Sequence, residues 1–207
     1  MPINAIRNKT PAQIREDVAG FAARYVQDWN AWLTVDVDAR PELFGRILRK
    51  WQATRPRAMR RLKREQKHDE PFLDDLLASA REPLRKLAGL SVLTIAKRAS
   101  AQTDALNALW KNLLRLPATG AATCVSITKA ILLLTDGRIG PAFDSQVRRK
   151  LGVARPASCA EWLKNLEEIG EDIAAFERVN GPITKAVPTE FAGLAHGRLY
   201  DMALGPR

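Results

Sequence analysis

The sequence predicts an all-helical protein, and three observations support this. Apolar residues recur every three or four positions along most of the chain, which is the spacing of a buried helical face. N-capping residues and prolines precede several of these runs. Only residues 34–37 have a strand-like composition, and this segment is too short and isolated to start a sheet. The 207 residues, 46% of them hydrophobic, suffice for a substantial core in one domain spanning 1–207.

The first expected helix begins at Thr10, which can cap it ahead of Pro11 and form a capping box with Gln13. Apolar residues keep helical spacing from Ile14 to Trp32, so we expect one long amphipathic helix there.

Prolines mark the next boundaries. Pro41 can start a second helix, and Pro56 interrupts it before the chain continues. Pro71 and Pro83 are expected to open two more helices. A buried stripe then follows at the positions typical of a central helix, namely Leu106, Leu109, Trp110, Leu113 and Leu114.

The C-terminal part contains two further expected helices. Ser158 and Glu161 form a capping box before an apolar run that includes Trp162. After the break at residues 181–182, a last helix is expected to run through Phe191 and Met202.

The net charge of +10 is concentrated in one segment. Residues 46–67 contain ten basic residues against one acidic residue, a local balance of +9. Such a segment is typical of a phosphate-binding surface, although a solvated helix face is the simpler alternative. Trp51 and Met59 within it indicate a folded segment. The residues expected to bind DNA here are Arg55, Arg57, Arg60, Arg61 and Arg64.

A short turn follows the central helix. Leu116, Pro117, Thr119 and Gly120 are expected to form a hairpin between two helices, whose exposed N–H groups could hold a DNA phosphate. Asp144 lies further on, at the expected start of another helix.

Residues 106–153 resemble the helix-hairpin-helix DNA glycosylase superfamily. Its members grip one DNA strand with a Leu-Pro-Gly-x-Gly hairpin, which Leu116, Pro117 and Gly120 match, and Asp144 matches their catalytic aspartate. Ala118 stands where the family has its first glycine, and a Cβ is penalised there if φ is positive. The flanking matches are looser: Ser145, Val147, Leu151 and Gly152.

The resemblance implies two closely packed helical lobes with a cleft between them. Residues 1–100 would form the basic N-terminal lobe, 101–155 the hairpin and the catalytic segment, and 156–207 C-terminal helices that pack back. It also implies a DNA glycosylase that flips out a damaged or modified base and hydrolyses the N-glycosidic bond, leaving an abasic site. Both base repair and defence against phage DNA with modified bases fit this activity.

Asp144 and Lys129 each have two interpretations. A carboxylate beside the sugar would stabilise an oxocarbenium-like transition state, whereas Asp144 could equally be only a helix cap. The lysine that acts as nucleophile in bifunctional relatives is replaced by Ala122 or Thr123, so we expect no lyase activity. Lys129 is expected to be solvated or to face a DNA phosphate; catalysis by its amine would need another orientation of the helix.

The expected base pocket is drawn from Trp51, Trp110, His196 and Tyr200, for each of which a structural role is the alternative. Arg198 and Asp201 could line the same cleft if the last helix packs back on the catalytic segment.

Other site types lack support in the sequence. Cys124 and Cys159 are too few for an iron–sulfur cluster, and His68 and His196 are far apart, so no metal and no cofactor are expected. With no signal peptide or membrane span, a cytoplasmic monomer that binds DNA is expected. The alternative function is a non-catalytic helix-hairpin-helix protein that binds DNA or RNA.

Overall fold

The computed structural model describes residues 2–67 and 69–207, and in this part of the chain helices provide all the regular structure beyond two isolated bridges. The α-helices are α1 (Pro11–Ala19), α2 (Ala23–Thr34), α3 (Arg40–Lys50), α4 (Leu73–Lys86), α5 (Ser100–Leu113), α6 (Cys124–Leu134), α7 (Ser145–Leu151), α8 (Cys159–Asn180), α9 (Ile183–Ala186) and α10 (His196–Leu204). Short 3₁₀ turns occur at Val37–Ala39, Pro56–Ala58, Lys63–Glu65, Ile95–Lys97 and Thr189–Phe191. The all-helical expectation is confirmed. His68 lies outside the described residues.

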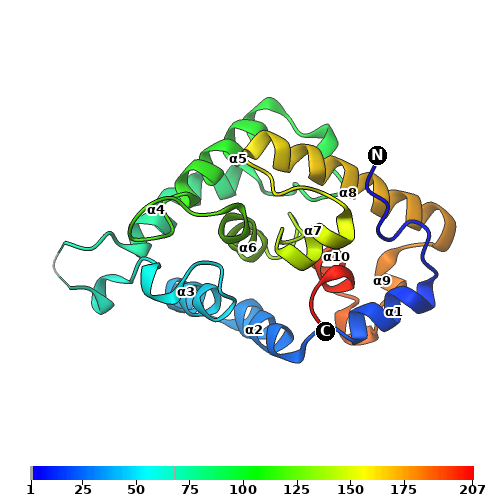
Figure 1. The fold of residues 1–207 in the computed structure, drawn as a ribbon, viewed down its shortest axis with the longest axis horizontal. Helices are drawn as coiled ribbons and strands as arrows, with labels where there is room; N and C mark the ends of the chain where they lie inside the picture. The colour runs from blue at the N-terminus through cyan, green and yellow to red at the C-terminus, as the bar shows by residue number, and fades with distance from the viewer. Residues whose placement is uncertain (1, 68) are drawn as a thin grey trace.

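Helix α6 lies at the centre of the fold (Figure 1). It packs against α3 and α5, while α4 pairs with α5 and α10 packs against α1, α7 and α9. Nearly every residue of α6 is buried, including the polar residues Ser126, Thr128 and Lys129. One continuous apolar cluster runs from Ile3 to Leu204, so the described segments share a single core.

Local capping signals are confirmed. Thr10 and Gln13 form the expected capping box at the start of α1, and Ser158 caps α8. The carboxylate of Glu161 accepts from the N–H of Ala157, one residue before the expected partner. Asp144 caps α7. These ends were predictable because a cap depends only on residues within one turn of it.

The expectation of one long first helix was wrong, because the segment divides into α1 and α2 at Gly20. The N–H of Gly20 closes α1 on the carbonyls of Glu16 and Val18. The N–H of Ala22 then donates to the carbonyl of Pro206 at 2.9 Å, so the break brings the chain against the C-terminal segment. This contact is remote in sequence and overrides the helical periodicity.

Three other boundaries differ. Pro83 lies inside α4, so it opens no helix. The basic segment after Lys50 is a loop with two 3₁₀ turns, since α3 ends there. The expected last helix is α9, a 3₁₀ turn and α10, with Phe191 in the turn.

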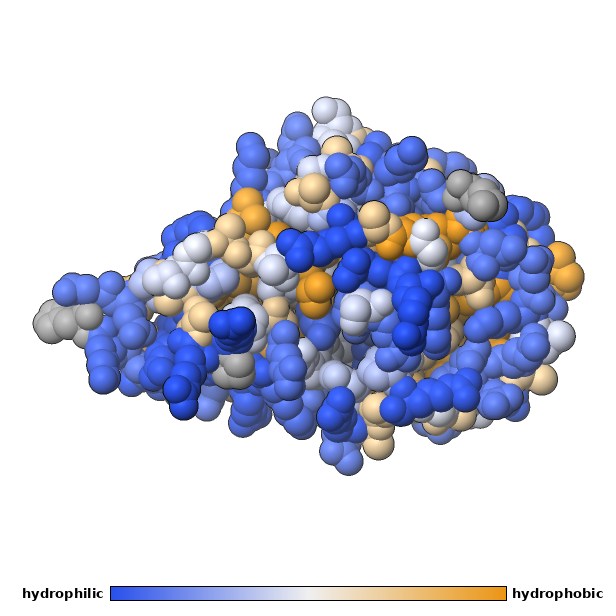
Figure 2. All heavy atoms as spheres, in the orientation of Figure 1, coloured by the Kyte–Doolittle hydropathy of each residue, from blue (hydrophilic) through white to orange (hydrophobic). Residues whose placement is uncertain are grey.

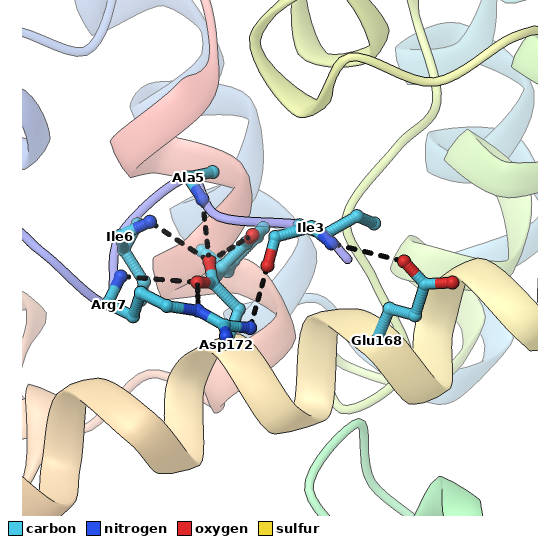
Figure 3. A network of polar contacts seen from close by, with 7 residues as sticks. Ile3, Ala5, Ile6, Arg7, Glu168 and Asp172 are labelled. Atoms are coloured by element: carbon cyan, nitrogen blue, oxygen red, sulfur yellow. Dashed lines mark hydrogen bonds and ion pairs between the residues drawn. The ribbon is translucent and has the colours of Figure 1, made fainter. Parts of the chain in front are cut away.

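Asp172 of α8 ties the N-terminal segment to the core (Figure 3). Its fully buried carboxylate accepts hydrogen bonds from the backbone N–H groups of Ala5, Ile6 and Arg7, at 2.9–3.2 Å. It also accepts from Nε of Arg7 at 2.9 Å and from the hydroxyl of Tyr200 at 2.8 Å. One side chain thus joins the N-terminal segment, α8 and α10.

Replacing Asp172 by Asn should lower the free energy of unfolding by about 3 kcal/mol, because a buried ion pair and several charge-assisted hydrogen bonds are lost together. Urea denaturation would measure this. Glu171→Gln, which removes an exposed carboxylate from the same helix, is the matched control and should change stability by less than about 0.5 kcal/mol. Equal effects of both variants would contradict the central role of Asp172.

Candidate active site

Asp144 caps α7 with one of its two carboxylate oxygens. Oδ1 accepts the N–H groups of Gln146 at 3.0 Å and Val147 at 2.9 Å. No hydrogen bond to Oδ2 is found among the described residues. The carboxylate is half-buried and lines an open cavity. The cap and the catalytic interpretation of Asp144 are therefore compatible, because the capping bonds leave Oδ2 available.

The backbone before Asp144 is held by buried side chains. The N–H of Phe143 donates to Oγ1 of Thr128 at 2.9 Å, and the N–H of Ala142 donates to Oδ1 of Asp201 at 3.0 Å. Helices α6 and α10 therefore both fix the direction in which the carboxylate of Asp144 points.

The cavity beside Asp144 has a volume of about 300 Å³. Its lining comes from five regions of the chain: Arg24, Tyr25, Lys50, Trp51, Gln52, Lys129, Asp144, Ser145, Gln146 and Pro206. A narrow recess of about 20 Å³ shares five of these residues and is closed by Phe21, Ala142, Arg198 and Asp201. The recess has room for about one water molecule, whereas the cavity is large enough for a planar ligand.

Lys129 lies in this cavity, not on the surface as expected. Lys129 is only 9% exposed, and its Nζ donates to the carbonyl of Trp51 at 2.8 Å. Burial lowers the pKa of the Lys129 amine, while the negative charges of Asp144 and Asp201 oppose that shift. Lys129 is almost entirely buried because α6 is enclosed on nearly all sides, and its small exposed part faces the cavity. The signal that indicates this in the sequence is the apolar run around Lys129, residues 130–134.

Arg198 and Asp201 line the recess, a position that the sequence analysis allowed if the last helix packs back on the catalytic segment. Nη1 of Arg198, a residue only 1% exposed, donates to Oδ2 of Asp201 at 2.7 Å. The guanidinium carbon lies 4.4 Å from the ring centre of Trp29, 4.9 Å from that of Phe21 and 5.8 Å from that of Trp51. Burial raises the pKa of Asp201, and Arg198 opposes the shift. This buried pair makes the floor of the recess polar.

Of the four residues expected in a base pocket, only Trp51 lines the cavity. Its ring meets that of Tyr25 edge-on, with centroids 5.7 Å apart, and Nε1 donates to Asp28 at 2.8 Å. Together with Tyr25 it provides an aromatic wall. Tyr25 was missed because its spacing on α2 resembles that of a core residue.

The other three expected pocket residues have structural roles. Trp110 packs against Trp162 with ring centroids 5.4 Å apart, between α5 and α8. A ring nitrogen of His196 lies 3.2 Å from a carboxylate oxygen of Glu177. Tyr200 bonds to Asp172, as described above, and burial raises the pKa of its hydroxyl. Burial of Trp110 and Tyr200 contradicts their assignment to a base pocket, and His196 lines neither the cavity nor the recess.

The hairpin between α5 and α6 lies against the basic loop. The N–H of Arg60 donates to the carbonyl of Leu116 at 3.0 Å, and the N–H of Ala118 donates to that of Ala58 at 2.6 Å. Two regions predicted separately to bind DNA thus become neighbours. They border a groove of about 310 Å³ lined by Gln52, Ala53, Thr54, Arg55, Ala58, Pro117, Thr119, Ala121, Ala122, Thr123 and Ser126.

The hairpin residues are not all accessible. Thr119 and Gly120 are exposed, and Gly120 has a φ of 73°, so the left-handed position of the turn is here and not at Ala118. The side chain of Leu116 is buried and lines neither the cavity nor the groove, whereas Pro117 is mostly buried but borders the groove. Leu116 contributes to the site only through its carbonyl.

The five arginines of the basic loop differ in availability. Arg60 is half-buried and its Nε donates to the carbonyl of Arg115, so its role is structural; burial lowers its pKa. Arg61 and Arg64 are exposed but pair with Glu70 and Glu42. Arg55 and Arg57 are exposed, and no ion pair to either is found within the described residues.

A second basic surface was missed in the sequence. Arg148, Arg149 and Lys150 follow Asp144 on α7, on the other side of α6 from the basic loop (Figure 1). Burial lowers the pKa of Lys150. The negative charge of Asp17 opposes this shift, whereas the positive charges of Lys9, Arg207 and Arg149 add to it. Figure 2 shows hydrophilic side chains over both regions. Cationic side chains therefore flank the cavity on two sides.

Comparison of the chain with protein-family models, with curated proteins and with solved structures found no match, so function has to be inferred from the geometry. In the described residues, no three His, Cys, Asp or Glu side chains form a group that could hold a metal ion. None of the helices that the structure describes is long and apolar enough to cross a membrane.

Neutralising Arg55 and Arg57 together by Gln should reduce DNA affinity and lower the log–log salt slope by up to about 1.8, because each phosphate contact contributes about 0.9. Fluorescence anisotropy at several salt concentrations would measure it. The matched control is Lys164→Gln with Arg178→Gln, which removes two exposed charges from α8. If both double variants lower the slope equally, the basic loop has no specific part in binding.

Proposed function

We propose that this protein is a DNA glycosylase that hydrolyses the N-glycosidic bond of a damaged or modified base. The observation that carries the proposal is the position of Asp144: Oδ1 is held by the cap of α7, and the carboxylate lines an aromatic-walled cavity between two cationic surfaces. DNA as the partner is supported by those surfaces and by the exposed backbone of Thr119 and Gly120.

In this proposal the target nucleotide leaves the duplex and its base enters the cavity. Tyr25 and Trp51 offer the apolar wall that an extruded base requires. The carboxylate of Asp144 then stabilises the positive charge that develops on the sugar. A water oxygen bonds to C1′ and releases one proton while the C1′–N bond breaks; the base leaves with that electron pair and takes up a proton, so one water is consumed. The product is an intact strand with an abasic site.

A second route is favoured by the position of Lys129, whose amine lies in the same cavity as Asp144. In its neutral form, which the lowered pKa favours, the amine carries a lone pair that can attack C1′. The Nζ–C1′ bond would form as the C1′–N bond to the base breaks, giving a covalent intermediate. The hydrogen bond of Nζ to the carbonyl of Trp51 opposes this use, since it holds the amine in a structural position. Water attack is therefore the route that we propose.

Replacing Asp144 by Asn should lower base excision about 10²-fold or more, because the charge opposite the sugar cation is lost. Folding and DNA binding should persist, since Asn Oδ1 can still accept both capping bonds. The assay counts alkali-labile sites in DNA carrying damaged, modified and phage-type bases, including glucosylated cytosines. Asp104→Asn removes an exposed carboxylate from α5 and is the control. If the wild-type protein binds these DNAs but excises no base, the function is non-catalytic nucleic-acid binding.

Borohydride should trap no covalent adduct between the wild-type protein and a DNA that it processes, because water attack forms no imine. The product strand should break only after alkali or heat. Adduct formation would be read as a band of lower mobility in a denaturing gel. An efficiently trapped adduct that disappears in Lys129→Gln would instead establish the amine route.

A further inference from the structure

A separate groove of about 180 Å³ opens between α2, α3 and α4, and it shares no lining residue with the cavity, the recess or the groove beside the hairpin. Its lining is largely apolar and includes the buried rings of Trp32 and Phe44 and the half-buried Leu134 at the end of α6. Val37, at its edge, is 78% exposed. An apolar groove that continues into an exposed apolar side chain is typical of a surface that a partner covers.

Helix α4 has two apolar faces, and the fold uses only one of them. Leu76 and Ala80 are buried, and α4 packs mainly on α5. Leu77, Arg81 and Leu84 follow one another at helical spacing along a second face, and all three line the apolar groove. Leu77 and Leu84 remain half-buried. This stripe covers two turns of helix, about 11 Å, so the apolar groove suits a short segment of another chain.

Two arginines in the apolar groove lack a carboxylate partner. The guanidinium carbon of Arg40 lies 5.1 Å from the ring centre of Trp32, and Nε of Arg40 is buried with no hydrogen bond to any described residue. No ion pair to Arg40 or Arg81 is found in the part of the chain that the structure describes. A buried donor without an acceptor is rare in a native protein, and a bound ligand is one way to satisfy it.

The acidic residues closest to these arginines in the chain are already paired. Glu42 binds Arg64, and Glu82 binds two basic residues of its own helix. Asp136 accepts the indole N–H of Trp32 at 3.0 Å, on the far side of the ring's polar edge. None of the described residues that line the apolar groove is acidic. The fold therefore leaves the two guanidinium groups for a negative charge supplied from outside.

We propose that the apolar groove binds an acidic segment of a partner protein. Its apolar side chains, of the size of leucine or phenylalanine, pack on Trp32 and Phe44, and its carboxylates pair with Arg40 and Arg81. A second copy of this chain is a poorer occupant, because the chain has a net charge of +10 and like charges repel. The inference does not depend on the proposed function, since the candidate active site contains none of these residues.

The probe is a displayed library of random peptides. Peptides that bind the wild-type protein are collected, and those that also bind the double variant Arg40→Gln with Arg81→Gln are discarded. This step removes acidic peptides that bind the other basic surfaces. The remaining peptides should combine aspartate or glutamate with leucine, isoleucine, phenylalanine or methionine. The most enriched peptide, synthesised with a fluorescent label, should bind the double variant at least about 10-fold more weakly in anisotropy measurements.

The apolar contact is tested with a variant that plays no part in the selection. Val37→Ser should weaken binding of the labelled peptide about 5-fold, because an apolar contact at the edge of the groove is lost. The matched control is Val179→Ser, since Val179 is 80% exposed on α8 and does not line the groove. Replacing Arg55 and Arg57 by Gln should also leave peptide affinity unchanged. The Tm of each variant should stay within about 2 °C of the wild type, because such surface substitutions change stability little.

Several results would overturn the inference. One is a selection that leaves no peptide, or only peptides without acidic residues. Another is an equal effect of Val37→Ser and Val179→Ser. A wild-type dimer in sedimentation velocity that becomes a monomer in Val37→Ser would identify a second copy as the occupant.

DNA binding by the double variant separates this inference from the proposed function. Arg40→Gln with Arg81→Gln should leave DNA affinity and its salt slope unchanged. A loss as large as that caused by replacing Arg55 and Arg57 would assign the two arginines to the DNA surface and overturn the inference. The glycosylase proposal is judged by base excision in the wild type and its loss in Asp144→Asn, whatever the apolar groove binds.

Discussion

The candidate site depends on the burial of one polar helix face. Helix α6 is enclosed on nearly all sides, so Ser126, Thr128 and most of the Lys129 side chain are removed from bulk water and each bonds to a partner in the protein. Ser126 and Lys129 bind the turn after α3, and Thr128 binds the backbone just before Asp144. The two walls of the cavity are therefore attached to the same short stretch of α6. Because an unmade bond in this interior costs about 1–3 kcal/mol, the walls cannot easily move apart.

The basic loop shows how an irregular segment can still be well held. Its backbone pairs with the hairpin through Arg60 and Ala118, and the Arg60 side chain reaches the carbonyl of Arg115. Two of its other arginines pair with acidic neighbours. Arg55 and Arg57, for which the described residues provide no ion pair, remain on this fixed backbone for the proposed contact with DNA. A count of charges in sequence overstates such a surface, since part of the charge is used in holding the loop in place.

Much of the fold could be predicted from sequence because its signals are local. The caps at Thr10, Ser158 and Asp144 act within one turn, and the apolar spacing of α5 is evident. The break at Gly20 could not be predicted, since it depends on a hydrogen bond to Pro206.

The candidate site was only partly predictable for the same reason, because its residues meet through contacts that are remote in sequence. Asp144 and Trp51, both expected in the site, line one cavity. Lys129 was expected to be solvated or to face a phosphate, because periodicity does not say which face of a buried helix lies beside a cavity. Trp110 and Tyr200 are residue types that often line a base pocket. Only the folded structure shows that each instead contacts a residue of α8, Trp162 and Asp172 respectively.

The recess floor joins parts of the chain that are distant in sequence, which has a consequence for how the protein reaches its native state. Phe21 and Tyr25 precede or begin α2, whereas Arg198 and Asp201 belong to α10, and Arg198 reaches the carbonyl of Tyr25 across 173 positions. The bonds that attach the N-terminal segment to Asp172 span a similar separation. Contacts of such long range form late, after the entropy of closing a large loop has been overcome. Local helices and the hairpin can therefore form while the chain is still being synthesised, but the recess can close only once α10 has been made.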